Sequence, residues 1–330
     1  MKQTNLHVVI TGASSGIGAA TAIEFARQGA HLVLGARGRE GLDDIANRCR
    51  AAGGRAEVAT VDVTDAAAVA EFAAGARRAL GRIDLWFSNV GIGVVGKYDD
   101  VPIADHRRVV ETNLIGHMND AHVVLPIFQA QGHGIWVNMI SVGGFVTSPY
   151  AAAYAASKFG LRGFSAALRG ELHDRPNIHI CDVFPTFVDT PGVRHAANYT
   201  GARLSCPPGA LAPETVARAV VKLARRPRDT TVVGMPEALL KLGQFANPVV
   251  AVLMSRFMKS WSRRAQYASD TTGTLYAPPA GASGVDGGQR TSAQGPQRAQ
   301  PARVALAVGG VLGGVLIATA IGVQLLRRRS

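Results

Sequence analysis

The chain has 330 residues, 47% of them hydrophobic, which suits one large α/β domain with appendages or two modest domains. Its formal net charge is +12, but the arginines are scattered except at the very end, so we expect no nucleic-acid partner. Its three cysteines, Cys49, Cys181 and Cys206, share no short metal-ligand spacing, so we expect reduced thiols and no metal site.

Short apolar runs alternate with helix-like stretches from the start of the chain to about residue 235. The runs are rich in Val, Ile and Leu, which is typical of strands buried on both faces of a parallel sheet. We expect strands at Leu6–Ile10, His31–Leu34, Glu57–Val61, Ile83–Phe87, Gly134–Met139, Ile178–Val183 and Thr231–Val233. The repeated strand–helix order predicts an α/β fold, a Rossmann-type doubly wound parallel sheet in a single domain.

The first expected strand runs into a glycine-rich turn that opens a helix over Ala19–Gln28. The turn reads Thr11-Gly12-Ala13-Ser14-Ser15-Gly16-Ile17-Gly18. Glycines let the backbone approach a pyrophosphate closely, and the start of a helix offers it free N–H groups and a positive dipole. A purely structural turn is the alternative, but the position between a strand and a helix favours a dinucleotide site.

The end of the second expected strand indicates which dinucleotide binds. NAD enzymes usually place an acidic residue there, where it binds the ribose 2′-hydroxyl. In this chain that position is Ala36, and Arg37 follows it. A guanidinium pairs with a 2′-phosphate, so NADP(H) is the expected cofactor; the alternative is that Arg37 is a solvated surface residue.

A tyrosine and a lysine four residues apart form the expected catalytic pair. Tyr154 and Lys158 lie on one face of the helix in Tyr154-Ala155-Ala156-Ser157-Lys158. A nearby ammonium stabilises phenolate and lowers a tyrosine pKa, so the tyrosine can exchange a proton with a substrate oxygen. Ser141 follows an expected strand thirteen residues earlier, which strengthens this interpretation.

Taken together, residues 6 to about 235 resemble the short-chain dehydrogenase/reductase family, whose phosphate loop reads TGxxxGIG. Further motifs of that family follow in order: Asp62-Val63, Ser88-Asn89-Val90-Gly91 in place of NNAG, Asn113, Ser141, and Phe184-Pro185-Thr186-Phe187-Val188-Asp189-Thr190 in place of PGxVxT. The chain departs from the pattern at Ile140, which replaces a first serine, and at Thr186, which replaces a glycine.

The resemblance implies catalytic roles for Asn113, Ser141, Tyr154 and Lys158. In the family, the serine hydroxyl holds the substrate oxygen, the asparagine helps to hold a water in a proton relay, and the lysine also grips the nicotinamide ribose. Cofactor contacts are implied for Gly12, Ser14, Ser15, Gly16, Ile17, Gly18, Arg37, Asp62, Val63, Asn89, Gly91, Tyr154, Lys158, Pro185, Val188 and Thr190. We read His117 and His122 as interface or solvent groups, not as ligands.

The expected function is therefore an NADP(H)-dependent oxidoreductase that interconverts a carbonyl and an alcohol on a small, lipophilic molecule near a membrane. One alternative is epimerisation or dehydration on the same fold. Another is a non-catalytic membrane scaffold that senses NADP(H), which the presence of Tyr154 and Lys158 disfavours. We also expect a homo-oligomer.

The C-terminal part of the chain has a different organisation. We expect the catalytic domain to cover residues 1–268 and to include an amphipathic helical extension, 236–265, that Pro248 divides or kinks. This extension packs on protein or lies on anionic lipid. A polar, disordered linker over 269–303 then leads to an uncharged stretch, Val304–Leu326. A helix of that length spans a bilayer, so we expect a transmembrane anchor and, because no export signal is visible, a catalytic domain that faces the cytoplasm.

Overall fold

The computed structural model of the protein describes residues 6–207, 209–282 and 284–290. Its centre is a seven-stranded sheet with the order β3-β2-β1-β4-β6-β7-β9, in which every neighbouring pair is parallel. The strands are β1 (His7–Thr11), β2 (His31–Ala36), β3 (Arg55–Thr60), β4 (Leu85–Ser88), β6 (Gly134–Met139), β7 (Ile178–Pro185) and β9 (Thr230–Val233). The seven predicted strands and the predicted fold class are confirmed, with small shifts at the strand ends.

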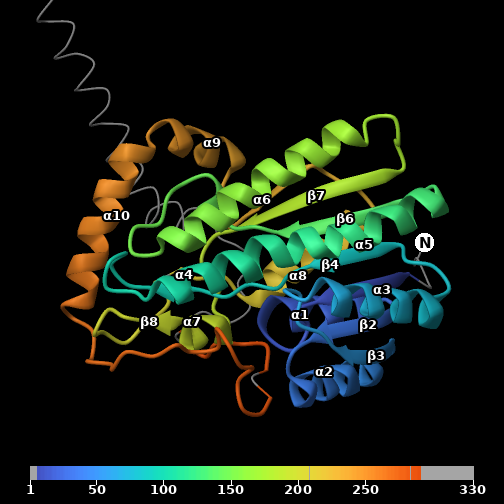
Figure 1. Ribbon diagram of the computed structural model, residues 1–330, viewed down its shortest axis with the longest axis horizontal. Coiled ribbons are helices and arrows are strands. Elements are labelled where there is room, and N and C mark those ends of the chain that lie inside the picture. Colours follow the sequence, from blue (N-terminus) through green and yellow to red (C-terminus); the bar gives the residue numbers. More distant parts are fainter. Residues whose placement is uncertain (1–5, 208, 283, 291–330) are drawn as a thin grey trace, which may run out of the picture.

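Helices cover both faces of this sheet (Figure 1). The helices of one face, α1 (Gly16–Ala26), α2 (Arg39–Ala51) and α8 (Pro213–Leu223), share a buried apolar cluster with the sheet. The helices of the other face, α3 (Ala66–Leu80), α5 (Gly116–Gln131) and α6 (Ala152–Glu171), share a second cluster. Neighbouring residues of β1 alternate between the clusters, with Val8 and Ile10 in the first and Val9 in the second. This alternation explains the continuous apolar run, because both faces of the strand are buried.

A smaller layer of structure lies beside the carboxyl ends of the main strands. It contains α4 (Ile103–Val110), α7 (Pro191–His195) and two short parallel strands, β5 (Val94–Val95) and β8 (Ala197–Asn198). The sequence analysis missed this second sheet because two-residue strands have no periodicity to detect.

Two helices follow β9 in the stretch 236–265, where we expect an amphipathic helical extension. They are α9 (Glu237–Phe245) and α10 (Asn247–Ser262), and Pro248 lies in the first turn of α10. In the described part of the chain no single helix is long and apolar enough to cross a membrane; α9 and α10 pass that test only as a pair bent by 97°. The predicted span Val304–Leu326 lies outside the described residues.

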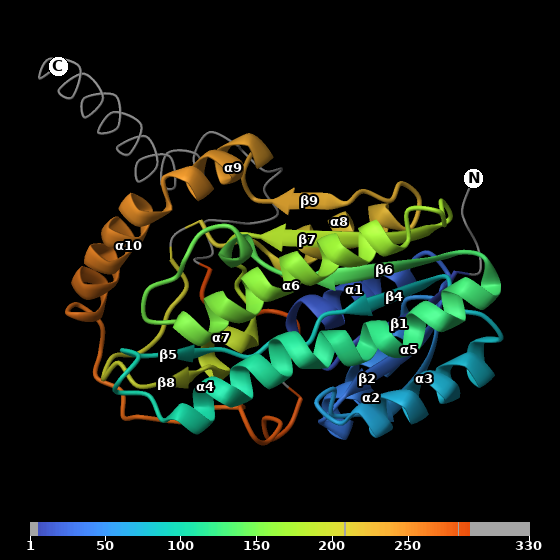
Figure 2. The same ribbon diagram turned by 45° about the horizontal axis from the view of Figure 1, so that its top comes forward.

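The segment after α10 differs from the disordered linker expected from residue 269 onward. Up to Arg290, its described residues run back beneath α7 and β8 toward α2 (Figures 1 and 2). Leu275 is 1% exposed and Val285 is 8% exposed, so both are core residues. The prediction of a linker was wrong for this stretch because two isolated apolar residues and many backbone hydrogen bonds hold it, and composition reveals neither.

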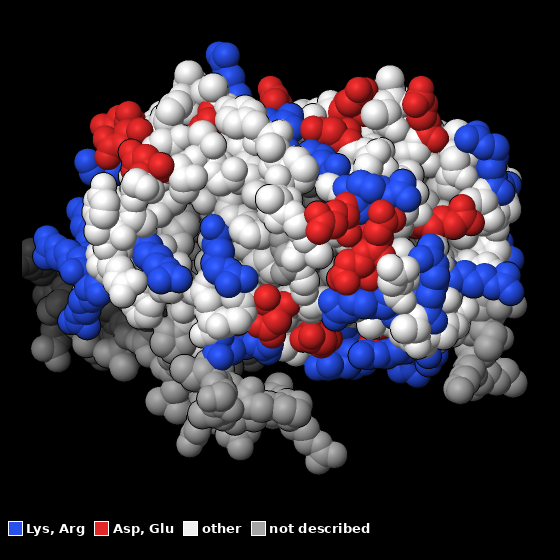
Figure 3. Space-filling view, turned by 90° about the horizontal axis from the view of Figure 1, so that it is seen from below, with Lys and Arg blue, Asp and Glu red and all other residues white. Residues whose placement is uncertain are grey.

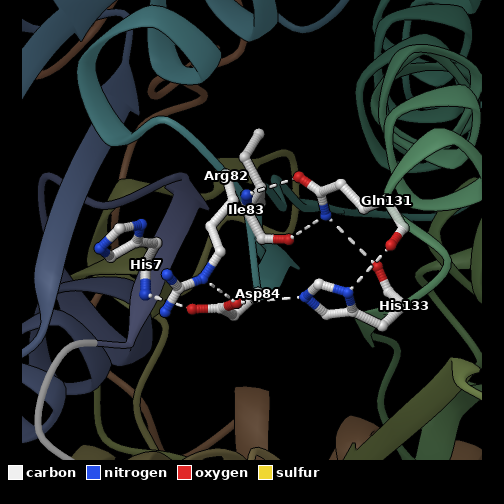
Figure 4. Close-up of polar contacts among 6 residues, drawn as sticks. All are labelled: His7, Arg82, Ile83, Asp84, Gln131 and His133. Carbon is white, nitrogen blue, oxygen red and sulfur yellow. Dashed lines mark hydrogen bonds and ion pairs between the residues drawn. The ribbon is translucent and has the colours of Figure 1, made fainter.

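A polar cluster joins the strands at the opposite, amino edge of the sheet (Figure 4). The Asp84 carboxylate accepts hydrogen bonds from the His7 backbone N–H at 2.9 Å and from Arg82 Nε at 2.8 Å, and it lies 3.5 Å from His133 Nε2. The Gln131 side chain bonds both the N–H and the carbonyl of Ile83. These contacts tie β1, β4 and the α5–β6 turn together, and they lie far from the carboxyl edge.

The surface charges agree with the scattered basic residues of the sequence. Over the side of α2 and α3, the face seen from below carries Lys and Arg interspersed with Asp and Glu (Figure 3). Exposed i,i+4 pairs such as Arg39 with Asp43 contribute to this alternation. Charges of both signs therefore alternate over this side of the molecule.

Candidate active site and cofactor groove

The predicted motifs meet at the carboxyl edge of the sheet, around the point where the strand order reverses between β1 and β4. In doubly wound sheets this switch point opens the crevice in which ligands bind. The turn after β1 and the end of β2 lie on one side of it, and the turns after β4, β6 and β7 lie on the other. Motifs far apart in the sequence are thereby brought to a single groove.

The glycines of the turn after β1 fit a phosphate loop. Gly12 has φ +71° and Gly16 has φ +56°, both in the left-handed region that favours glycine. A Cβ on Gly12 would lie 3.0 Å from the backbone of Val90, and one on Gly18 would overlap the Gly12 carbonyl and lie 2.7 Å from Asn89 Nδ2. Asn89 Nδ2 donates to the Gly12 oxygen at 3.1 Å, so the turns after β1 and β4 are locked together.

The other residues of this loop flank the start of α1. Ser15 is the N-cap in an extended conformation and makes no side-chain capping bond, and Ile17 packs against the first core cluster. A Cβ on Gly41 of α2 would lie 3.1 Å from Ser14 Cβ, which places Ser14 beside that helix. The loop is therefore shaped by close backbone approach, and its backbone donors face the groove at the helix start.

Arg37 and Asp62 lie at the ends of β2 and β3, where the adenosine half of a dinucleotide is expected. Both terminal nitrogens of Arg37 donate to backbone carbonyls, of Leu275 at 3.0 Å and of Thr274 at 2.6 Å. Burial lowers the pKa of Arg37; the Asp62 carboxylate raises it and the Arg108 cation adds to the lowering. Arg37 is therefore a partly buried cation, not the solvated surface residue that the sequence left as the alternative.

A second arginine, Arg108 of α4, pairs with Asp62. Its Nη2 donates to Asp62 at 2.7 Å, and its Nη1 donates to Thr64 Oγ1 at 2.9 Å. Burial would raise the pKa of Asp62, but hydrogen bonds from Thr64 and Arg108 hold it below its usual value. Sequence reasoning missed Arg108, because only the fold brings α4 to the end of β3. Val63, next to Asp62, is buried, and its carbonyl accepts from Asn119 at 2.8 Å.

Tyr154 and Lys158 lie on the same face of α6, as predicted, beside Ser141. A Cβ on Gly143 would lie 3.4 Å from Tyr154 Cε1 and 3.5 Å from Ser141 Oγ, so these two side chains face one another. Lys158 Nζ lies 5.7 Å from the centre of the Tyr154 ring. A Cβ on Gly91 would lie 4.0 Å from Lys158 Nζ, so the lysine reaches the turn after β4.

Burial changes the pKa of both titratable groups of this pair. It lowers the pKa of Lys158 to about 7, and the buried ammonium donates to the Met139 carbonyl at 3.0 Å. Burial raises the pKa of Tyr154, contrary to the lowering that the sequence analysis expected from Lys158, and the hydrogen bond with Ser141 acts in the opposite direction. Ser141 has φ 147°, a conformation that residues with a side chain rarely adopt, and its Oγ accepts from the Gly143 N–H at 3.1 Å. The serine is thus held in a strained position beside the tyrosine.

Asn113 lies in a π-helical turn, Glu111–Ile115, between α4 and α5. Such turns are rare and often mark functional sites. The buried side chain accepts from the Ile92 N–H at 2.8 Å, donates to the Ile92 carbonyl at 2.9 Å, and lies 3.3 Å from Ser157 Oγ. The asparagine therefore joins the helix before α5 to the turn after β4 and to α6.

The loop after β7 closes the other side of the groove. Pro185 pairs with Val233 of β9, and Val188 forms an isolated bridge with Leu211. A Cβ on Gly16 would lie 3.2 Å from Thr190 Cβ, so Thr190 lies against the phosphate loop. Thr186, which replaces the family glycine, donates its N–H to the Val233 carbonyl at 3.0 Å, and the loop keeps its connection to β9.

His117 corrects the sequence analysis, which assigned it to an interface or to solvent. It is fully buried, with Nδ1 2.6 Å from Asn138 Oδ1 and Nε2 2.7 Å from the Val90 carbonyl. Burial, aided by the Lys158 charge, lowers the pKa of His117 to about 4. This neutral imidazole joins β6 to the turn after β4, whereas His122 on the same helix is exposed. Sequence spacing could not distinguish the two, because only packing decides which one is buried.

The fold and the site place the protein in the class of oxidoreductases that use a nicotinamide dinucleotide. Comparisons with known proteins identify its family. The model of the short chain dehydrogenase family matches residues 6–199. Cis-4-hydroxycyclohexanecarboxylate dehydrogenase of Sinomonas cyclohexanicum is 36% identical over 222 residues, which are 66% of this chain and 88% of that protein. A ketoacyl reductase of Nostoc sp. is 30% identical over 242 residues, 72% of this chain and 83% of its own.

Solved structures give the same result. The alcohol dehydrogenase of the archaeon Thermococcus sibiricus, complexed with 5-hydroxy-NADP, has a TM-score of 0.62 and 27% identity and covers 69% of this chain and 96% of its own. A metagenomic short-chain oxidoreductase in complex with NADP has a TM-score of 0.60 and 28% identity and covers 71% of this chain and 98% of its own. The protein belongs to the short-chain dehydrogenase/reductase family, as its motifs predicted, and the NADP complexes agree with the expected cofactor.

Proposed function

We propose that the protein is an NADP(H)-dependent oxidoreductase that interconverts a carbonyl and an alcohol. The observation that supports this best is the juxtaposition of Ser141, Tyr154 and Lys158 at the end of the phosphate-loop groove. Lys158, whose counterpart in the family grips the nicotinamide ribose, lies beside Gly91 in the turn after β4. NADP(H), when bound, supplies or accepts the hydride at the substrate carbon.

The side chains of this chain supply the proton chemistry. Ser141 Oγ holds the carbonyl oxygen of the substrate, and the Tyr154 hydroxyl donates a proton to that oxygen as it gains negative charge. The Lys158 ammonium stabilises the phenolate that remains. Asn113 fixes the turn around Ile92 against α6 and holds the relay through which the lysine is reprotonated. In the oxidative direction each step runs in reverse.

Arg37 supports a preference for NADP(H) over NAD(H). It is a partly buried cation at the end of β2, with Arg108 close enough to affect its pKa. Two guanidinium groups suit the doubly charged 2′-phosphate, and the nearest carboxylate, Asp62, is already paired with Arg108.

A substrate screen tests the catalytic proposal and its alternatives. NADPH oxidation is followed with aliphatic, alicyclic and long-chain carbonyl compounds, and products are identified by mass spectrometry. We expect the corresponding alcohol and one NADPH consumed per turnover. Turnover without net NADPH consumption would indicate epimerisation or dehydration. Tight NADPH binding with no turnover in any class would indicate a sensing scaffold.

The helical extension supports the further proposal that the substrate is lipophilic and is met at a membrane. Large apolar side chains of α9 and α10 are exposed, among them Leu242 at 52%, Phe245 at 87% and Val252 at 53%. Between Glu237 and Asp270 the chain has no acidic residue, but it has five basic ones: Lys241, Arg256, Lys259, Arg263 and Arg264. An apolar surface flanked by cations suits anionic lipid.

The extension is also tied to the active-site region. Asn247 Oδ1, at the start of α10, accepts from the Thr147 N–H at 3.0 Å and from its hydroxyl at 2.9 Å. A mostly apolar cavity of about 460 Å³ lies between the loop at 147–149, α6 and Asn247. We propose that residues 304–326 anchor the protein through a single span and that the catalytic domain faces the cytoplasm, where NADP(H) is available.

We also propose that the protein is a homo-oligomer. Apolar side chains on α4, on the π-helical turn after it and on α5 support this, because Ile103 is 57% exposed, Ile115 is 41% exposed and Met118 is 37% exposed. Light scattering of the purified chain that ends at Arg290 tests it, and a mass equal to one chain at micromolar concentration would contradict it.

A further inference from the structure

The segment after α10 crosses the cofactor groove from one side to the other. We call residues 273–290 the strap; its described residues are 273–282 and 284–290. It starts beside α7 and β8, where Thr271, just before the strap, pairs with Asn198 and the Thr274 N–H donates to the His195 carbonyl at 2.9 Å. It then passes the ends of β2 and α2, where Pro278 lies against Gly38, and returns to the loop after β7. Figures 1 and 2 show this path as the orange-red trace beneath α7 and β8.

The strap places carbonyl oxygens where the 2′-phosphate is expected. Arg37 donates from both terminal nitrogens to the carbonyls of Thr274 and Leu275, at 2.6 and 3.0 Å. Arg108 Nε also donates to the Leu275 carbonyl, at 3.2 Å. Carbonyl oxygens are the same kind of acceptor as phosphate oxygens, so strap and phosphate would use the same donors.

A second contact is made at the phosphate loop. The Gly16 N–H donates to the Gly284 carbonyl at 3.0 Å. This donor belongs to the first turn of α1, whose free N–H groups are the ones expected to face the pyrophosphate. The strap thus engages donors at both phosphate positions of the expected cofactor, one of them a cation.

Apolar and polar anchors hold the strap in place. Leu275 is 1% exposed and packs with Val94, Val101 and Val109. The Tyr276 hydroxyl donates at 2.7 Å to Asp105, a buried carboxylate that also accepts from Tyr199. At the far end, the buried Asp189 carboxylate accepts from the backbone N–H groups of Gln289 and Arg290, both at 2.8 Å. Asp189 directly precedes Thr190, which we expect to contact the cofactor, so the strap ends beside the cofactor groove.

We propose that the strap is an autoinhibitory element that competes with NADP(H) for the Arg37 and Gly16 donors. The proposal rests on the cofactor proposed above and names a regulation of the same groove. Binding of NADP(H) requires the strap to release these donors, and the measured affinity is then reduced by the fraction of molecules in which the strap is bound. Any partner or surface that draws the strap away raises the affinity for the cofactor.

A matched pair of truncations tests this competition. One chain ends at Arg290 and keeps the strap; the other ends at Thr272, keeps the Thr271–Asn198 pairing and lacks the strap. NADPH binding to each is measured by calorimetry or by cofactor fluorescence. We expect the chain without the strap to bind NADPH at least about tenfold more tightly. Hydrogen–deuterium exchange of residues 273–290 should rise when NADPH is added to the longer chain.

Point variants guard against misfolding of the shorter chain. Leu275→Ala removes the apolar anchor, and Tyr276→Phe removes the hydrogen bond to Asp105, so both should tighten NADPH binding. Tyr267→Phe, at an exposed tyrosine before the strap, is the control and should leave NADPH binding unchanged. Equal affinities with and without the strap would overturn the proposal. The proposal would also be overturned if the chain without the strap bound NADPH more weakly and if NADPH reduced hydrogen–deuterium exchange of residues 273–290 in the longer chain. The strap would then hold the bound cofactor in place. Absence of NADPH binding in every chain would instead refute the proposed function.

Discussion

At the scale of single residues, Tyr154 is the position on which the proposed chemistry depends most. Tyr154→Phe removes the proton donor and leaves the cofactor groove unchanged, so kcat should fall by at least about 100-fold while the Kd for NADPH changes by less than about twofold. Tyr98→Phe, at a tyrosine that is 61% exposed, is the matched control and should keep full activity. Retention of most activity in Tyr154→Phe would refute the mechanism.

Lys158 differs from Tyr154 because it is expected to touch the cofactor as well. Lys158→Ala should lower kcat and weaken NADPH binding together. Titration of NADPH into both variants separates the role of Lys158 in catalysis from its role in cofactor binding. An unchanged Kd for NADPH in Lys158→Ala would contradict the proposed ribose contact.

Arg37 should determine the cofactor preference. Arg37→Asp places a negative charge against the 2′-phosphate, so the Kd for NADPH should rise about 100-fold while that for NADH rises little. Because this variant also loses the bonds to the strap, the comparison is made in the chain that ends at Thr272. Equal affinity of the unmodified protein for both cofactors would remove the basis for this role.

His117 should make the fold sensitive to acid. Its pKa in the folded state is about 4, below the ordinary 6.5, so the unfolded chain binds more protons between these two values. Stability should therefore fall as the pH drops from 6.5 to 4, by about 3 kcal/mol from this residue alone. Urea unfolding at several pH values should show that His117→Gln loses this part of the slope, while His122→Gln, at an exposed histidine of the same helix, keeps it.

At the scale of elements, the sequence predicted those features that are repeated or local. The seven main strands, the helix with Tyr154 and Lys158, and the division of the C-terminal extension at Pro248 all follow from periodicity or from one residue's backbone preference. His117, Arg108 and Asp189 were missed because their roles depend on partners that are distant in the sequence. The strap was mistaken for a linker because its polar composition does not reveal that Leu275 and Val285 are buried.

The Asp84 cluster makes a prediction about how elements are joined. Asp84→Asn weakens the contacts of Arg82 and His133 and should lower the free energy of unfolding at pH 7 by about 1–3 kcal/mol. The loss should shrink below about pH 4, because hydrogen bonds hold the pKa of the native carboxylate below its usual value and that contribution disappears on protonation.

The exposed Asp99 provides the control for that measurement. Asp99→Asn should leave the unfolding free energy unchanged, and both variants should bind NADPH normally because the cluster lies at the opposite edge of the sheet from the groove. Reduced NADPH affinity in Asp84→Asn with unchanged stability would contradict the structural role.

At the scale of the whole molecule, the proposed membrane attachment has two separable parts. The full-length protein should remain with membranes after a high-salt wash, because a hydrophobic span is insensitive to salt. The chain that ends at Arg290 should bind anionic vesicles only weakly and should be released by salt, because it retains only the basic, apolar surface of α9 and α10.

Charge variants of α10 test the second part. Arg256→Gln with Lys259→Gln in the shorter chain should reduce vesicle binding several-fold without changing NADPH affinity. A full-length protein recovered entirely in the soluble fraction would refute the proposed span.

The attachment of Arg290 to Asp189 also limits the length of free chain between the catalytic domain and the proposed membrane span. If the chain were free from residue 269 onward, a longer linker would allow a greater distance between the catalytic domain and the proposed span. With the strap bound, only residues 291–303 separate Arg290 from the proposed span, and thirteen residues reach at most about 45 Å. The loop after β7, which carries Asp189, would then stay within about 45 Å of the proposed span, and release of the strap would lengthen this distance. A single segment would thus set both the availability of the cofactor groove and the enzyme's distance from its substrate supply.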